Sequence, residues 1–446
     1  MKIHQSRGSI SRAVFLTMLG MFAGLHHVAA VRPNQTVATA DYCQSWVSLI
    51  PTQIPALLAR AESGDVQAQC ILGHAYHFGR SMEKDDVEGA KWLLKAAEAG
   101  LALAQFQLGY LYESGSGTGR NDVQAVKWYR KSADQGIAAA ENNLGYMYFE
   151  GKGGLAQSYG EAEKWLRRAA EQGLPTAQTN LGALYEDGRG VTRDYTEALR
   201  WYRKAAGQGH GDGEARLGLM YLHAKGVARN DAVALGFFRS GASHGSPHAY
   251  TCLGYMYFMG YGVRQDYIAA LKWTRAAAEK GIPAAQQNLG YMYESGLGTA
   301  PDYREALKWY YAAAIAGISA SQNTIGDYFA TGKGVRRDNV VAARWYRKAA
   351  EQGHVAAQMN LGALYMTGRG VRPDYVEAYM WFILATTGGS QTGAKALVHL
   401  HRVMTPEQLR EAQQRAFSWQ ARLGVSEGDA ARSHEQFLVN RAAIQL

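Results

Sequence analysis

The chain has 446 residues, of which 47% are hydrophobic and 19% are charged, and its formal net charge is +9. Three of the basic residues, Lys2, Arg7 and Arg12, precede residue 31 in a stretch without Asp or Glu, so a chain beginning at Val31 would carry +6. No long basic run and no known nucleic-acid-binding module occurs, which argues against a nucleic-acid partner.

The first 30 residues have the organisation of a secretory signal peptide. Basic residues precede an apolar run from Ala13 to Leu25, and Val28-Ala29-Ala30 provides small residues at a cleavage site. The run is shorter than the ~20 apolar residues that a membrane-spanning helix needs. We therefore expect cleavage near Ala30 and export of the mature chain, with an uncleaved membrane anchor as the alternative.

A repeat of 36 or 37 residues occupies most of the chain. It is marked by Leu-Gly or Ile-Gly pairs that are followed by an aromatic residue three positions after the glycine. Such a fixed period indicates a solenoid of stacked units rather than separate globular domains. The repeat glycines are Gly73, Gly109, Gly145, Gly182, Gly218, Gly254, Gly290, Gly326 and Gly362.

A second marker follows each repeat glycine by 19 residues, or by 20 in the third repeat. It is tryptophan in every repeat but the fifth, where Phe237 stands in its place. Each repeat then closes on a glycine, as at Gly100 and Gly389. The tryptophans are Trp92, Trp128, Trp165, Trp201, Trp273, Trp309, Trp345 and Trp381.

The seventh repeat illustrates why each unit is predicted to be a helical hairpin. Apolar residues at helical spacing between Ala285 and Tyr293 predict an amphipathic first helix. Asp302 and Glu305 have the spacing of a capping box at the start of a second helix, and Gly317 is suited to end it. The same device recurs as Asp85 with Glu88, Ser158 with Glu161, Asp194 with Glu197, and Asp374 with Glu377.

A glycine inside a helix costs about 1 kcal/mol relative to alanine, so nine such glycines need a compensating interaction. A bare backbone lets a neighbouring helix approach closely, and a large aromatic side chain from the second helix can fill the space around the glycine. We interpret the tryptophans as core residues rather than as a ligand-binding cage.

The Leu-Gly-x-x-Tyr, Ala-x-x-Trp and closing-glycine pattern resembles the Sel-1-like repeat, a relative of the tetratricopeptide repeat. The resemblance covers about Asp65 to Gly389, with departures at Gly213, Phe237, Ser321 and Phe329. It implies an all-α, right-handed α/α superhelical solenoid of nine helical-hairpin repeats with helical caps. The expected organisation is a signal peptide (1–30), an N-terminal helical cap (31–64), nine repeats (65–389), and a C-terminal helical cap and tail (390–446).

Further helices are predicted on both sides of the repeats. They run from Tyr42 to Ile50, from Pro55 to Gly64 and from Gln391 to Arg402. Thr405-Pro406-Glu407-Gln408 then combines an N-cap, a proline in the first helical position and a capping-box glutamine. These four residues predict a last helix that reaches about Arg422.

Signals for catalysis and for metal binding are weak. Ser81 and Lys84 fit Ser-x-x-Lys, but they fall in a loop and lack the companion motifs of that class of enzyme. His74 and His77 lie three residues apart on a helix, and no third ligand or HExxH pattern accompanies them. We therefore expect no catalytic residue, no metal and no cofactor.

An exported chain could carry one disulfide, between Cys43 and Cys70, which would join the leading segment to the first repeat. The alternative is that these two cysteines and Cys252 are small core residues.

The resemblance also predicts a partner-binding surface, since the first helices of tetratricopeptide-like solenoids line an extended groove. It places groove positions two residues before, one after and four after the repeat glycine. Asparagine can both donate and accept hydrogen bonds, and tyrosine offers contact area at low entropic cost. The alternative is that these side chains hydrogen-bond between adjacent hairpins. This predicted binding row consists of Asn143, Asn180, Asn288, Asn360, Tyr110, Tyr146, Tyr255, Tyr291, Glu113, Glu186 and Glu294.

As groove residues, Tyr291 and Glu294 should tolerate replacement by alanine, with a change of less than about 1 kcal/mol in the free energy of unfolding.

These features together favour an exported, monomeric scaffold or adaptor that binds a protein or peptide in a bacterial periplasm or outside the cell. The bacterial origin rests on the resemblance alone. Two alternatives stay open: a module that binds cell-wall glycan or regulates a wall-processing enzyme, and a hydrolase. No stable membrane span is expected after cleavage of the signal peptide.

Overall fold

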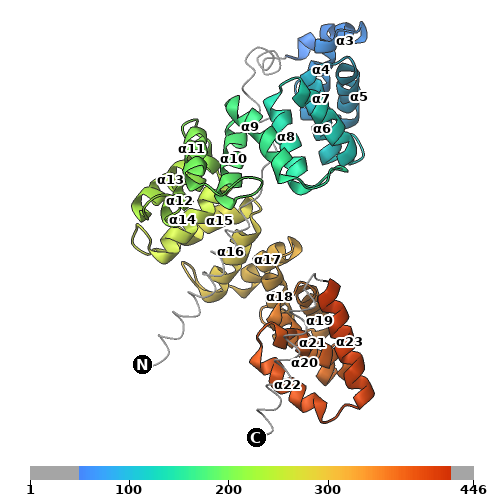
Figure 1. Ribbon diagram of the computed structural model, residues 1–446, viewed down its shortest axis with the longest axis vertical. Helices are drawn as coiled ribbons and strands as arrows, with labels where there is room; N and C mark the ends of the chain where they lie inside the picture. The colour runs from blue at the N-terminus through green and yellow to red at the C-terminus, as the bar shows by residue number, and fades with distance from the viewer. Residues whose placement is uncertain (1–49, 423–446) are drawn as a thin grey trace. The chain divides into compact units, whose positions relative to one another are not determined.

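The computed structural model describes residues 50–422, and within this range every regular element is a helix (Figure 1). The helices form two compact units, one ending at Gln265 and the other beginning at Asp266. No helix in the described range is long and apolar enough to cross a membrane. The signal peptide, its cleavage site near Ala30, residues 42–49 and Cys43 all lie outside the described residues.

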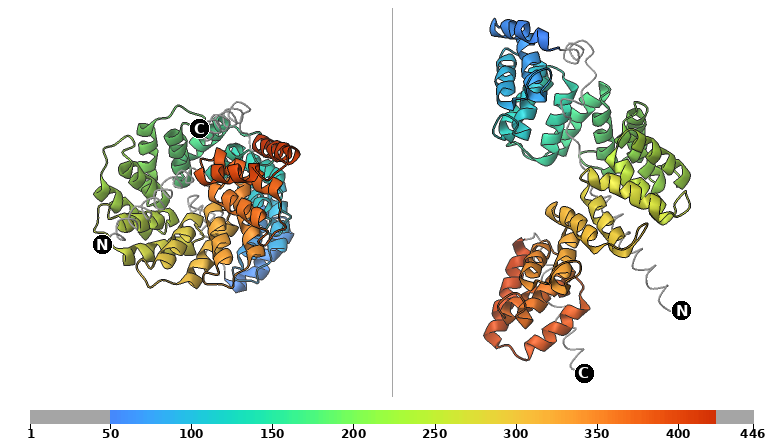
Figure 2. Two further views of the ribbon diagram at one scale, coloured as in Figure 1. Left: turned by 90° about the horizontal axis from the view of Figure 1, so that it is seen from below. Right: turned by 180° about the vertical axis from the view of Figure 1, so that it is seen from behind.

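The first unit contains an N-terminal cap, five helical hairpins and the first helix of the sixth repeat (Figures 1 and 2). The cap is η3 (Pro51–Gln53) with α3 (Ile54–Glu62), where the sequence predicted a lone helix. The hairpins are α4 (Val66–Phe78) with α5 (Asp86–Glu98), α6 (Ala102–Ser114) with α7 (Asp122–Asp134), α8 (Ala138–Glu150) with α9 (Tyr159–Glu171), α10 (Pro175–Asp187) with α11 (Tyr195–Ala206), and α12 (Gly211–Leu222) with α13 (Asp231–Ser243), and α14 (Pro247–Met259) follows them.

The second unit begins with the second helix of the sixth repeat and continues with three hairpins and two closing helices. Its elements are α15 (Tyr267–Glu279), α16 (Pro283–Ser295) with α17 (Tyr303–Ile315), α18 (Ser319–Thr331) with α19 (Asn339–Glu351), α20 (Val355–Thr367) with α21 (Tyr375–Thr387), α22 (Gln391–His401) and α23 (Pro406–Arg422). Within each unit, a second helix of a hairpin contacts its own first helix and the first helix of the next repeat. The predicted all-α repeat solenoid is confirmed.

The repeat glycines do allow close helix packing, but the side chain that fills the space is the residue after the tryptophan. A Cβ atom on Gly182 would lie 2.6 Å from Cε1 of Tyr202, and one on Gly326 would lie 2.5 Å from Tyr346. An aromatic ring therefore packs directly on the bare backbone, and leucine takes its place in the first and third repeats. In the eight repeats other than the sixth, the residues in this position are Leu93, Tyr129, Leu166, Tyr202, Phe238, Tyr310, Tyr346 and Phe382. The sixth repeat has Thr274 there.

Trp128, Trp201 and Trp381 pack toward the preceding repeat. Trp201 of α11 lies against Ala169 and Ala170 of α9 and against Leu181 of α10, so it joins two repeats. The interpretation as core residues is confirmed for the four that are buried, whereas the other four are half-buried. The buried ones are Trp92, Trp128, Trp201 and Trp381, and the half-buried ones are Trp165, Trp273, Trp309 and Trp345.

Only one half of the capping box predicted in the repeats is present. The Asp194 side chain accepts hydrogen bonds from backbone N–H groups in the first turn of α11. Its own backbone N–H donates to the carbonyl oxygen of Tyr185 in the preceding helix. Because that N–H already has a partner, Glu197 forms an ion pair with Arg200 at 3.2 Å instead of completing the box.

The C-terminal cap departs from the repeat pattern. Helix α22 packs on α21, and α23 also packs on α21 instead of forming a close hairpin with α22. The capping box predicted at the start of α23 is present. The Thr405 backbone N–H donates to Gln408 Oε1 (3.0 Å), and the Gln408 backbone N–H donates to Thr405 Oγ1 (3.3 Å).

Ala224 offers a test of the loop geometry. It has a φ of +55°, in a position where the fourth repeat has Gly188. A left-handed conformation costs a non-glycine residue about 1–2 kcal/mol, and glycine loses about 0.5–1 kcal/mol more backbone entropy on folding. We expect Ala224→Gly to raise the free energy of unfolding by roughly 0.5–1 kcal/mol in urea denaturation. Ala232→Gly, an exposed helical position, should lower it, and a decrease in both variants would contradict the assigned loop conformation.

Candidate functional site

The predicted binding row divides into a buried set and a part-exposed set. This division depends on the neighbours that each side chain meets in the folded repeats. The buried members are Asn143, Asn180, Asn288, Tyr255 and Glu186, and the part-exposed members are Tyr110, Tyr146, Tyr291, Glu113, Glu294 and Asn360.

Each of the three glutamates accepts a hydrogen bond from a tyrosine hydroxyl on the second helix of its own repeat. The tyrosine is the same one that packs on the repeat glycine, so the phenol ring and its hydroxyl serve different contacts. The pairs are Tyr129 with Glu113 (2.6 Å), Tyr202 with Glu186 (2.7 Å) and Tyr310 with Glu294 (2.8 Å).

Two of the glutamates also bind a lysine from the next repeat. Lys225 Nζ donates to Glu186 Oε1 at 2.6 Å, and Lys333 Nζ donates to Glu294 Oε1 at the same distance. Both lysines follow the first helix of their repeat, and both contacts span 39 residues. These carboxylates therefore connect consecutive repeats.

The environments of Glu113 and Glu186 shift their pKa values in opposite directions. Burial raises the pKa of Glu113, and the hydrogen bond from Tyr129 and the charge of Lys152 offset only part of that effect. Burial also acts to raise the pKa of Glu186, but the charges of Arg216 and Lys225 outweigh it, so this pKa lies below its usual value. Glu186 is therefore a buried anion, 3.8 Å from the Arg216 guanidinium.

The asparagines of the row form amide contacts between repeats. Asn180 Nδ2 donates to Asn142 Oδ1 at 2.8 Å, across 38 residues of sequence. Asn360 Nδ2 donates to Asn323 Oδ1 at 3.1 Å and to Asp327 Oδ1 at 3.2 Å. Hydrogen bonds between adjacent hairpins were the alternative to partner binding in the sequence analysis, and these contacts are of that kind.

The stability expected for the Tyr291 and Glu294 double variant needs correction. Without Glu294, the buried hydroxyl of Tyr310 and the ammonium group of Lys333 lose their acceptor, which costs about 1–3 kcal/mol for a buried group. Glu294 is therefore a structural residue as well as a part-exposed one, and its replacement does not test binding cleanly.

Tyr110 and Tyr146 are the members best placed to meet a partner in the first unit. Each lies one residue after the repeat glycine, in α6 and α8 respectively, and each is part-exposed. Both pack at the edge of the same core cluster. Lys152 Nζ donates to the Tyr146 hydroxyl at 2.6 Å and lies 4.7 Å from the ring centre. The ring of His77 meets that of Tyr110 edge-on at 6.4 Å. These contacts restrict both phenol rings before any partner binds.

A further series of hydrogen bonds between repeats, from arginine to tyrosine, was not predicted from the sequence. At five positions within residues 50–422, an arginine of a second helix donates to a tyrosine hydroxyl 18 residues later, in the first helix of the next repeat. The constant offset of an Arg and a Tyr was the available signal. The pairs are Arg130 with Tyr148, Arg167 with Tyr185, Arg239 with Tyr257, Arg275 with Tyr293, and Arg347 with Tyr365.

The two histidines of the first repeat have different partners. His74 is buried and its Nδ1 lies 3.2 Å from Gln107 Nε2, and burial lowers the pKa of His74 to about 3. His77 Nδ1 lies 2.7 Å from Asp86 Oδ1. Within residues 50–422, no cluster of three or more His, Cys, Asp or Glu side chains has the arrangement of a metal site.

The two cysteines in the described range, Cys70 and Cys252, are both buried. Cys70 Sγ lies 3.7 Å from Gln107 Oε1, and burial raises the pKa of Cys70 to about 12. Cys43, the predicted disulfide partner of Cys70, lies outside the described residues, so the pairing stays a prediction.

Comparison with known proteins agrees with the repeat period. The Sel1 repeat model matches nine consecutive segments: 66–101, 102–137, 138–174, 175–210, 211–246, 247–282, 283–318, 319–354 and 355–390. No curated protein matches the chain.

Two similar solved structures are bacterial. One is a protective antigen of uropathogenic Escherichia coli that displays an SLR fold, with 33% identity over 87% of this chain and 97% of that one and a TM-score of 0.47. Another is a Sel1 repeat protein from Oxalobacter formigenes, with 29% identity over 85% of this chain and 99% of that one and a TM-score of 0.48. Nine in-phase matches cover most of the chain, and the chain therefore belongs to the Sel1 repeat family, whose members are generally non-enzymatic protein-interaction scaffolds.

Proposed function

We propose that this chain is an exported scaffold that binds a protein or peptide through the part-exposed members of the binding row, with Tyr110 and Tyr146 as its main contacts in the first unit. The observation that carries the proposal is the position of these two tyrosines on the first helices of consecutive repeats, each restrained by a neighbouring side chain. A tyrosine that is already restrained loses little conformational entropy on binding.

The proposal is tested by capture from a bacterial envelope extract with tagged chain 31–446, followed by titration of the captured partner. Tyr110→Ala with Tyr146→Ala should weaken binding about thirtyfold, since truncation of two aromatic contacts often costs 2 kcal/mol or more. Each replacement should lower the free energy of unfolding by less than the roughly 3–5 kcal/mol of a fully buried aromatic residue, because both rings are only partly buried at the edge of a core cluster.

Tyr375→Ala is the matched control, because Tyr375 is 42% exposed and lies outside the binding row. It should bind the partner like the unmodified chain. Equal affinity of the double variant and the control would overturn the assignment of the surface.

Export rests on the N-terminal pattern of basic residues, a short apolar run and Val28-Ala29-Ala30. N-terminal sequencing of the protein recovered from the periplasm or the medium should begin near Val31. An intact Met1 in a membrane fraction would contradict both cleavage and export.

A further inference from the structure

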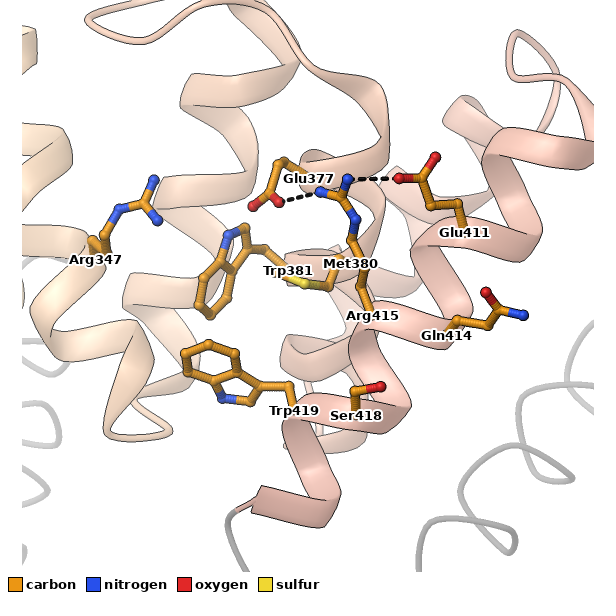
Figure 3. Close-up of a pocket in the computed structure, with 9 residues that line it drawn as sticks. All are labelled: Arg347, Glu377, Met380, Trp381, Glu411, Gln414, Arg415, Ser418 and Trp419. Atoms are coloured by element: carbon orange, nitrogen blue, oxygen red, sulfur yellow. Dashed lines mark hydrogen bonds and ion pairs between the residues drawn. The ribbon is translucent and has the colours of Figure 1, made fainter.

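A pocket of about 530 Å³ lies where the last helix packs on the final repeat in the second unit (Figure 3). Its volume falls within the range of ~300–1,000 Å³ typical of small-ligand sites. The lining residues come from three helices: Arg347 from α19, Glu377, Met380 and Trp381 from α21, and Glu411, Gln414, Arg415, Ser418 and Trp419 from α23.

Two indole rings form the apolar part of the pocket. Trp381 and Trp419 meet edge to face with ring centres 5.4 Å apart, and Figure 3 shows the two rings side by side. Trp381 is buried in the core of the ninth repeat, whereas Trp419 is half-buried on the outermost helix. The Trp419 ring can therefore offer surface to a ligand while Trp381 holds it in place.

The polar part of the pocket has two positive and two negative side chains and therefore no net charge. The Arg415 guanidinium donates to Glu377 Oε1 and to Glu411 Oε1, both at 2.6 Å (Figure 3). Arg347 supplies a second positive charge, so the two arginines balance the two glutamates. The exposed amide of Gln414 adds a donor and an acceptor on the same helix.

We propose that this pocket binds a neutral oligosaccharide. A sugar ring has an apolar C–H face that packs on an indole and a rim of hydroxyl groups that both donate and accept hydrogen bonds. The pocket matches both features, with Trp419 as the aromatic surface and carboxylate, guanidinium and amide groups around it. The two positive and two negative side chains leave the pocket without a net charge that would attract an anionic or a cationic ligand.

The pocket is separate from the binding row and depends on α23. Helix α23 contributes five of its lining residues and is not part of the nine repeats. The proposal therefore goes beyond protein binding by the repeats, and each can fail without the other.

The test is a titration of the full mature chain with cellotetraose, chitotetraose and maltotetraose, followed by tryptophan fluorescence and calorimetry. At least one of these neutral probes should bind saturably, with a Kd of about 1 mM or tighter. Trp419→Ala should weaken that binding about tenfold or more, as loss of an aromatic contact does. Gln414→Ala should weaken it about threefold to tenfold through the loss of hydrogen bonds to hydroxyl groups.

Two neighbours on α23 serve as matched controls. Gln413 and Phe417 do not line the pocket, so Gln413→Ala and Phe417→Ala should leave the Kd within about twofold. Because Gln414 is exposed, Gln414→Ala should leave the cap folded, so it still tests the pocket if Trp419→Ala unfolds the cap.

The proposal is overturned if none of the three probes binds at concentrations up to about 10 mM. It is also overturned if binding survives both pocket variants. A loss of captured protein partner in the Trp419→Ala and Gln414→Ala variants, without any sugar binding, would instead assign the pocket to a peptide.

Discussion

Trp201→Ala should lower the free energy of unfolding by about 3–5 kcal/mol, the usual cost of truncating an aromatic side chain in a core. The Trp201 side chain is 2% exposed and fills the space between α9 and α10. Lys204 covers the outer face of the ring, with its Nζ 4.0 Å from the ring centre. Alanine would leave a cavity between two repeats, so the loss weakens both the fourth repeat and its coupling to the third.

Urea denaturation followed by circular dichroism measures this effect. Lys204→Ala is the first control, since it removes an exposed cation and leaves the ring, and it should cost less than about 1 kcal/mol. Trp165→Ala, at the equivalent but half-buried position, should cost less than Trp201→Ala. An unchanged unfolding midpoint for Trp201→Ala would show that the ring is not part of the core.

Glu186→Gln should also be strongly destabilising at pH 7, by about 3–5 kcal/mol, because it removes one partner of a buried ion pair. The Glu186 carboxylate accepts from the Tyr202 hydroxyl and the Lys225 ammonium group and lies 3.8 Å from Arg216. The Arg216 side chain is only 11% exposed, so Glu186→Gln removes a negative charge from beside a buried cation.

Glu113→Gln is the matched control, since Glu113 has the same place in the second repeat and its pKa is raised by burial. The neutral amide can still accept from Tyr129, so we expect a change of less than about 1 kcal/mol at pH 7. Equal losses in the two variants would contradict the different charge environments.

The pH dependence of stability gives an independent check on Glu186. Its pKa is lower in the folded chain than the ordinary value of 4.5, so its contribution is present above that value and is lost as the pH falls through the lowered pKa. Glu113 has a raised pKa and acts in the opposite sense, because its contribution is lost as the pH rises through the folded value. The difference in stability between the unmodified chain and Glu186→Gln should therefore narrow toward acidic pH.

The sequence by itself determined the repeat, its period and the helical hairpin. These depend on local properties: apolar spacing that suits one helix face, glycines that end helices, and Asp or Ser side chains that cap them. The same local chemistry correctly predicted the capping box at Thr405 and Gln408. It also indicated that the glycine inside each first helix needs a large neighbour, although Tyr202 rather than Trp201 meets Gly182.

The tertiary structure decided which members of the binding row reach solvent. Asn180 and Glu186 share a helix face with residues that are part-exposed elsewhere, yet both are buried here because Asn142, Arg216 and Lys225 of other repeats cover them. Helical spacing defines a direction for each side chain, but burial depends on what the neighbouring repeat places in that direction.

The pocket beside Trp419 was likewise decided only by the tertiary structure. The sequence predicted the last helix and its start, but not that α23 would pack on α21 and bring Trp419 against Trp381. The ion pair between Arg415 and Glu377, for example, joins residues 38 positions apart in the sequence. Such contacts depend on complementary shape and charge between two helix surfaces. A local sequence pattern cannot predict that complementarity, because it describes one helix at a time and not the pair of helix surfaces that meet.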